Sequence, residues 1–203
     1  MTRVIAGVAR GRRLQVPAAG TRPTSDRVRE AMFSSVESLL IADGRSWAQV
    51  RVLDLFAGSG ALGLEALSRG AAAAVLVDKA RSAARVLSAN AAVVGCAGAE
   101  VVIRDARWLA AQPPLVVADL CFADPPYDWA AADIAEVLSG LGGSGWLAAD
   151  ALLIVERPAK DPLSPIPDAW PEARRRAYGD TVLWYGLFEE PERAHGHPDV
   201  RPS

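Results

Sequence analysis

Near-continuous apolar runs alternate with helical patterns through the middle of the chain. Five runs have the length and the valine and leucine content of buried strands: residues 50–56, 73–78, 100–104, 115–123 and 151–156. Helical patterns separate several of them, at residues 61–68, 80–92 and 130–140. Strands that are apolar on both sides and separated by helices indicate a parallel sheet covered on both faces.

The last part of the chain departs from this pattern. Residues 174–178 and 181–188 are joined by Gly179 and Asp180, which is typical of a hairpin with a two-residue turn. This hairpin would bring the strand count to seven. We therefore expect an α/β fold with a Rossmann-like, doubly wound, mostly parallel seven-stranded sheet that ends in a C-terminal antiparallel hairpin.

The first part predicts a smaller unit. Residues 4–6 and 13–16 flank a glycine-bracketed turn and predict an N-terminal β-hairpin, and a helix follows from about Ser25 or Asp26. Such a hairpin cannot bury a core of its own, so it should lean on the body or move. We expect three parts: an arm at 1–20, a body at 21–189 and a probably disordered tail at 190–203.

Composition fits one globular domain with a small appendage, since 51% of the 203 residues are apolar. No apolar run approaches the roughly 20 residues of a membrane span, and no signal-peptide core follows Met1. We expect a soluble, cytoplasmic protein, and a monomer by default. Cys96 and Cys121 are the only cysteines and His195 and His197 lie in the tail, so neither a disulfide framework nor a metal site is predicted.

Charge is distributed unevenly. Within residues 1–30, seven arginines and the two acids Asp26 and Glu30 give a net charge of +5. Since the whole chain has a net charge of −2, the remaining residues carry −7. The planar fork of arginine matches phosphate and stacks on bases, so we interpret the arm as a contact for RNA. The candidate contacts are Arg3, Arg10, Arg12, Arg13, Arg22 and Arg27. The alternative is a solubilising terminus.

A glycine-rich turn follows the first long strand. Gly58, Gly60 and Gly63 satisfy the G-x-G-x-x-G pattern of dinucleotide sites, and Asp78 ends the next strand at about the expected distance. Asp54, four residues before the first glycine, should face the cleft, where it would repel a pyrophosphate and attract the sulfonium of S-adenosylmethionine. A cationic cofactor is therefore favoured over NAD.

Further positions complete the predicted cofactor site. Asp78 can accept hydrogen bonds from ribose hydroxyls, and Asp105, with the Ala106 backbone, can hold the adenine amine. The flanking residues Ala57, Ser59 and Lys79 belong to the same predicted site. Two helix caps and an ordinary βα turn would explain these residues without a ligand.

Asp124-Pro125-Pro126-Tyr127 ends the fourth apolar run and carries the predicted chemistry. An amine on a purine or cytosine is a poor nucleophile until hydrogen-bond acceptors let its nitrogen pyramidalise. The Asp124 carboxylate and the Pro125 carbonyl can be these acceptors, because the prolines fix the backbone before reaction. Tyr127 offers a ring for base stacking. The motif favours a methyltransferase for an exocyclic nitrogen; the alternative is a simple strand-ending turn.

Together these motifs are similar to those of class I amino-methyltransferases. The segment Arg22-Pro23-Thr24 through Phe33, with the preceding hairpin, resembles the bacterial RsmD family, which methylates a guanine N2 in 16S ribosomal RNA. The resemblance implies S-adenosylmethionine as cofactor and the small ribosomal subunit, or its assembly intermediate, as substrate. It also implies that Arg22 and Thr24 line the cofactor or RNA cleft.

This chain departs from that family in two places. Relatives tend to place lysines in the first hairpin, whereas this arm has only arginines, and the tail after Glu190 matches nothing in the family pattern. Three other functions stay open: a DNA adenine-N6 methyltransferase, an NAD-dependent oxidoreductase, and a noncatalytic RNA-binding factor in ribosome assembly.

Overall fold

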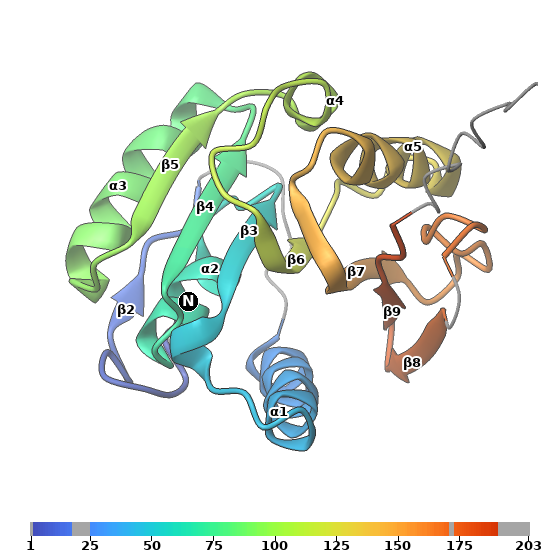
Figure 1. Cartoon of the computed structure of the whole chain (residues 1–203). Coiled ribbons are helices and arrows are strands. Elements are labelled where there is room, and N and C mark those ends of the chain that lie inside the picture. The colour runs from blue at the N-terminus through green and yellow to red at the C-terminus, as the bar shows by residue number, and fades with distance from the viewer. Residues whose placement is uncertain (1, 18–24, 171–172, 191–203) are drawn as a thin grey trace, which may run out of the picture.

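The computed structural model describes residues 2–17, 25–170 and 173–190 and contains one large sheet (Figure 1). Its seven strands are β3 (Arg51–Leu55), β4 (Ala73–Asp78), β5 (Ala99–Ile103), β6 (Ala118–Ala123), β7 (Leu147–Pro158), β8 (Arg174–Tyr178) and β9 (Thr181–Leu187). They lie in the order β5-β4-β3-β6-β7-β9-β8. The first five are parallel, and β9 is antiparallel to both β7 and β8. The predicted fold class is confirmed.

Helices cover both faces of this sheet. The first face packs on α1 (Asp26–Ala42), α2 (Ala61–Ser68) and α3 (Arg81–Val94), and the second on α4 (Ala106–Ala110) and α5 (Ala131–Gly143). Strand side chains alternate between the faces. In β3, Val52 belongs to the core with α1 to α3, whereas Leu53 and Leu55 belong to the core with α4 and α5.

Some predicted boundaries are wrong. Strand β6 begins at Ala118 rather than Leu115, which is exposed, and β7 begins four residues earlier than predicted, at Leu147. Asp150 in β7 adopts a left-handed φ of 59°, and the β6–β7 register shifts nearby, so the strand continues through an irregularity. Helix α4 and the 3-10 turn Trp47–Gln49 were not predicted, because such short pieces show no periodicity.

The N-terminal hairpin is present but smaller than predicted. Strands β1 (Thr2–Arg3) and β2 (Arg13–Leu14) pair over two residues each. The chain leaves the ladder because the amides of Ile5 and Ala6 donate to the Glu65 carboxylate in α2, at 2.6 and 2.9 Å.

Of the two behaviours expected for the arm, leaning on the body is confirmed. Val4, Ala9 and Leu14 are buried in the same core as α1 to α3. Gly7, with φ 79°, permits this contact, since a Cβ there would lie 1.8 Å from the Ser68 carbonyl oxygen. Residues 18–24 and 191–203 lie outside the described residues, and the division into arm, body and tail stays a prediction.

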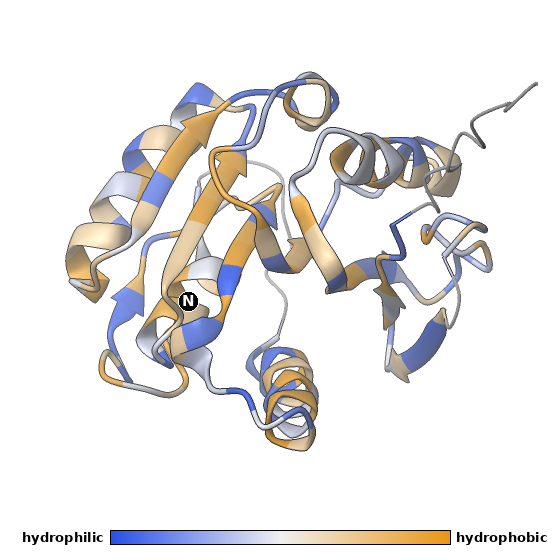
Figure 2. Ribbon diagram, viewed as in Figure 1, coloured by the Kyte–Doolittle hydropathy of each residue, from blue (hydrophilic) through white to orange (hydrophobic). Residues whose placement is uncertain are grey.

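Hydropathy follows the layers (Figure 2). The central strands carry apolar colours, whereas β8, at the sheet edge, is strongly hydrophilic. Its charged side chains oppose pairing with further strands. Across the described ranges, no helix is long and apolar enough to cross a membrane. Nor do those ranges contain a cluster of three or more histidine, cysteine or acidic residues that could hold a metal ion.

Candidate cofactor and substrate site

The glycine-rich turn joins β3 to α2 by close backbone contacts. Gly58 and Gly60 both adopt positive φ, 55° and 75°, and α2 begins directly after Gly60. The Ala57 amide donates to the Val77 carbonyl at 2.8 Å, which ties the turn to β4. A Cβ on Gly63 would lie 2.2 Å from a Leu76 methyl, so glycine lets the helix pack directly on the strand.

Acidic residues end the next two strands. Asp78 accepts from the amides of Gly58 and Ala80, at 2.9 and 2.8 Å, and so holds the glycine turn against the end of β4. Asp105 follows β5 and caps α4 by accepting from the Arg107 amide at 2.9 Å. Both carboxylates are half-buried. Each therefore has a structural role, and each oxygen keeps a further lone pair for a ligand.

Asp54 lies beneath the turn. Its carboxylate accepts from the Gly63 amide at 2.8 Å, and the residue is only 1% exposed. Burial raises the pKa of Asp54 to about 7; the charge of Asp78 adds to the rise and the Gly63 N–H opposes it. The expectation that Asp54 faces the cleft needs correction, because its position in β3 points toward α2. Its charge can reach a ligand only through the turn.

The Asp124-Pro125-Pro126-Tyr127 motif follows β6 directly. Asp124 is half-buried and Pro125 buried, whereas Tyr127 is 57% exposed. The Trp129 amide donates to the Pro126 carbonyl at 3.0 Å and closes a turn after the motif. Tyr127 is therefore accessible to a base, while its neighbours are fixed in the backbone.

Trp129 anchors the loop that carries this motif. Its ring packs edge-on against Phe56, with centroids 4.9 Å apart, and the Arg107 guanidinium lies 4.1 Å from the ring centroid. The Trp129 carbonyl accepts from buried Arg157 in β7 at 2.7 Å. No local pattern in the sequence pointed to Arg157, because its partner lies 28 residues away.

Residues at the ends of β3, β4, β5 and β6 line one pocket of about 70 Å³. Its wall contains Phe56, Gly58, Val77, Asp78, Lys79, Arg104, Asp105, Ala106, Asp124 and Pro126. Seven of these ten were predicted site residues, and Phe56, Val77 and Arg104 were missed. Small-molecule sites usually measure roughly 300–1,000 Å³, so a ligand of cofactor size would extend beyond this pocket.

Several other predicted site residues do not line this pocket but are close in sequence to residues that do. Ala57, Ser59 and Gly60 complete the turn behind it, and the Ser59 carbonyl accepts from Asn90 at 2.8 Å. Pro125 and Tyr127 flank the motif residues that line the pocket. Thr24 and Arg22 lie outside the described residues.

The candidate RNA-binding arginines of the arm lie away from this pocket. Arg3, Arg10, Arg13 and Arg27 are exposed, and Arg3 lies 3.4 Å from Asp26. Arg12 donates to the carbonyls of Val93 and Val94, the latter at 2.8 Å, at the end of α3. Arg12 therefore fastens the arm to the body, and its predicted RNA contact would compete with that bond.

Known proteins similar to this chain identify its family. Residues 2–186 match the family described as Conserved hypothetical protein 95. The Ribosomal RNA small subunit methyltransferase D of Escherichia coli K12 is 37% identical over 199 residues, covering 98% of this chain and 93% of that protein. Its namesake in Haemophilus influenzae is 34% identical, covering 92% and 93%. The chain belongs to this family, the RsmD methyltransferases.

The solved structures agree with the family. That of the candidate methyltransferase yhhF of Escherichia coli superimposes with a TM-score of 0.79 at 35% identity, covering 94% of this chain and 99% of that one. A methyltransferase of this family implies a cofactor of the S-adenosylmethionine type. The family therefore favours a cofactor of this type over NAD, the ligand that the G-x-G-x-x-G pattern alone would suggest.

Proposed function

We propose that this RsmD family member transfers a methyl group from S-adenosylmethionine to the exocyclic N2 of a guanine in 16S ribosomal RNA. The observation that carries the proposal is the shared pocket wall, where Asp124 and Pro126 after β6 meet Asp78 and Asp105 after β4 and β5. The relatives named as small-subunit ribosomal RNA methyltransferases support the RNA substrate. A small subunit or its assembly intermediate is the proposed physical substrate.

The residues at the ends of β3 to β5 suit a nucleoside cofactor. Asp78 would hold the ribose hydroxyls, and Asp105 with the Ala106 amide would hold the adenine edge. The buried Asp54, once ionised, would favour a cation at the glycine turn over a pyrophosphate. When bound, the cofactor supplies an electrophilic methyl group on sulfur. Thr24 and Lys79 are proposed as further contacts.

The residues after β6 would prepare the acceptor nitrogen. The Asp124 carboxylate and the Pro125 carbonyl would each accept one amine hydrogen, which frees the nitrogen lone pair for attack. Pro126 keeps this backbone rigid, so little reorganisation is needed during reaction. Tyr127 would stack on the guanine, a contact worth roughly 1–3 kcal/mol.

Catalysis of this kind consists mainly of positioning. The guanine must leave any helical stack to reach the half-buried Asp124 carboxylate, so a loop or a bulge of the RNA is the expected target. The exposed arginines Arg3, Arg10, Arg13 and Arg27 are proposed to bind RNA phosphates, with Arg12 and Arg22 as further candidates.

The test is transfer of labelled methyl from S-adenosylmethionine to small subunits that lack the modification, followed by mapping of the labelled nucleotide. Label on a guanine N2 is expected; label on adenine, on DNA or on no RNA would overturn the proposal.

Asp124→Asn should lower the rate at saturating substrate on the order of 10²–10⁴-fold, while S-adenosylhomocysteine still binds. The matched control is Asp128→Asn, since Asp128 is exposed in the same loop and carries no assigned role. Equal rates for the two variants would remove Asp124 from the mechanism.

A further inference from the structure

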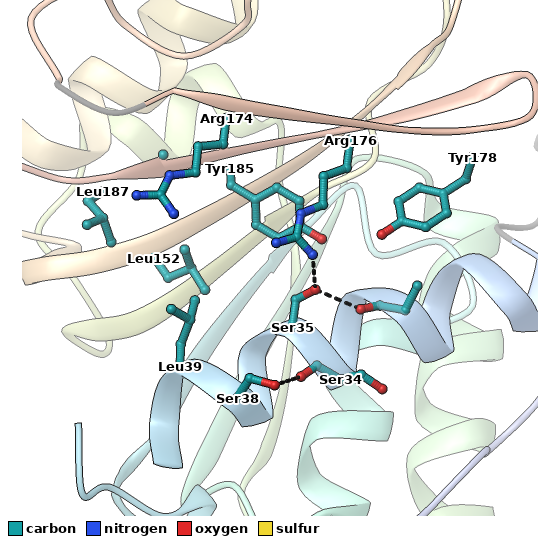
Figure 3. A pocket seen from close by; sticks show the side chains of 12 residues that line it. Ser34, Ser35, Ser38, Leu39, Leu152, Arg174, Arg176, Tyr178, Tyr185 and Leu187 are labelled. Atoms are coloured by element: carbon teal, nitrogen blue, oxygen red, sulfur yellow. Dashed lines mark hydrogen bonds between the residues drawn. The ribbon is translucent and has the colours of Figure 1, made fainter. Parts of the chain in front are cut away.

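A second pocket lies between α1 and the C-terminal hairpin, on the face of the sheet that packs on α1 to α3 (Figure 3). Its volume is about 510 Å³, much larger than the pocket at the strand ends. We call it the hairpin groove. The side chains used below are Ser35 and Ser38 of α1, Arg174, Arg176 and Tyr178 of β8, and Tyr185 of β9.

Strand geometry directs the β8 side chains into the groove. Arg174, Arg176 and Tyr178 occupy alternate positions, so they share one face of the strand and point toward α1. Arg175 occupies the other face, where its guanidinium lies 6.0 Å from the Trp184 ring centroid. The run of three arginines is thus divided, with two in the groove and one outside it.

Cationic, aromatic and apolar side chains line the groove, the apolar ones including Leu39, Leu152 and Leu187. No acidic residue lines it in the described structure. Arg176 donates to the Ser35 hydroxyl at 3.1 Å and lies 5.6 Å from the Tyr185 ring centroid. The Tyr185 hydroxyl is buried at the wall, close to the side chains of Ser35 and Tyr178. The groove thus offers guanidinium groups, hydroxyls and ring faces to a ligand, and no carboxylate is among the described residues that line it.

The groove starts at the catalytic edge of the sheet. Tyr178 pairs with Thr181, and Thr181 pairs with Pro158, the last residue of β7. Since β6 and β7 are parallel, the end of β7 lies on the edge where β6 ends and Asp124 follows. From Tyr178 to Arg174 the strand extends roughly 13 Å, which is long enough to contact more than one nucleotide of an extended strand.

We propose that the hairpin groove binds a single-stranded stretch of the RNA substrate next to the target guanine. Arg174 and Arg176 contact phosphates, and Tyr178 contacts a base at the end nearer the catalytic edge. A basic groove with aromatic side chains is the usual surface for unpaired nucleic acid. An apolar protein segment suits it less well, since it would bury the guanidinium groups of Arg174 and Arg176 without a charged partner. The proposal rests on the proposed function.

The test uses two pairs of variants. In each pair, one variant changes a residue that lines the groove, and the control changes a residue of the same strand or helix that does not. Arg176→Gln removes a groove charge, and Arg175→Gln removes the same charge from the other face of β8. Ser38→Glu places a carboxylate in the groove, and Ile41→Glu places one on an exposed part of α1 that does not line it. Ser38 is itself exposed, so its variant needs no repacking.

Binding to unmodified small subunits is measured without turnover, at several salt concentrations. We expect Arg176→Gln and Ser38→Glu to weaken binding by several-fold to tenfold, and Arg176→Gln to flatten the salt dependence by about 0.7 in log–log slope. S-adenosylhomocysteine binding should not change in any of the four. If each groove variant weakens binding no more than its control, the net charge of the protein alone explains the affinity, and the proposal fails.

A photo-crosslinker in place of Tyr178 identifies the occupant. Crosslinks to 16S ribosomal RNA are expected, and crosslinks to a ribosomal protein would overturn the groove proposal while leaving the methyltransferase proposal intact. Failure of the proposed function is seen separately, in the wild-type protein, as methyl label on a different atom or on no RNA; that result would overturn both.

Discussion

Replacing Asp54 with asparagine should remove a pH-dependent loss in the free energy of unfolding, which we call the cost of the buried carboxylate. Burial raises the pKa of this carboxyl to about 7, against an ordinary 3.8. Between these values the folded chain holds a proton that the unfolded chain has released, so raising the pH through this window favours unfolding. The cost is absent below the unfolded pKa, grows across the window, and is constant above the folded pKa.

The magnitude follows from the size of the shift. About three pKa units at 1.36 kcal/mol each correspond to a cost on the order of 4 kcal/mol above pH 7. Asparagine can keep the hydrogen bond from the Gly63 amide, which lies 2.8 Å from the carboxylate oxygen. Its amide group, however, places a buried donor where the second oxygen was, at a cost of about 1–3 kcal/mol. The net gain above pH 7 should be about 1–3 kcal/mol.

Urea unfolding of both proteins at pH 5, 6.5 and 8 checks this reasoning. The free energy of unfolding of Asp54→Asn, minus that of the wild type, should increase by about 2–3 kcal/mol from pH 5 to pH 8. Asp119 and Asp161 do not confuse the comparison, because their arginine partners lower their pKa values and both proteins contain them. A difference that stays constant with pH would refute the raised pKa.

Two further predictions concern the same turn. At pH 8, Asp54→Asn should weaken binding of S-adenosylmethionine by about tenfold more than binding of S-adenosylhomocysteine, which lacks the sulfonium charge. Opposite charges roughly 10 Å apart attract by about 1.7 kcal/mol at an effective dielectric constant of 20. Calorimetry with both ligands measures this difference, and equal losses would contradict a charge effect. Gly63→Ala should destabilise the fold by about 1–3 kcal/mol, because the added Cβ would lie 2.2 Å from a Leu76 methyl. The control Gly143→Ala, in a helix with nothing within 4 Å of the new Cβ, should instead be neutral or stabilising by up to about 1 kcal/mol in urea unfolding.

Local sequence patterns predicted most of the sheet and the edge at which the pocket lies. Apolar runs identified the parallel strands because both of their faces are buried, and turn residues directly after those runs fell at one edge because the strands are parallel. Gly63 was recognisable because its spacing from Gly58 and Gly60 is fixed by the turn. Asp54 was misplaced, since the pattern gave its distance from the glycines but not the face of β3 toward which it points.

Contacts between distant segments could not be predicted. Glu65 interrupts an apolar helix, and only the folded arm explains it, through amides about 60 residues away. The hairpin groove depends on Ser35 and Arg176, which are 141 positions apart. The three consecutive arginines at 174–176 were a visible signal, but the sequence offered no way to tell which of them faced α1.

The order of the strands also bears on how the chain folds during its own synthesis. Leu183 and Tyr185 of β9 belong to the same core as Val28 and Phe33 of α1. Helix α1 leaves the ribosome early, yet part of its apolar face must await a strand translated about 150 residues later. At roughly 5–20 residues per second that interval is about 8–30 s. Nascent chains should therefore expose this face to chaperones, and truncation before β9 should lead to aggregation.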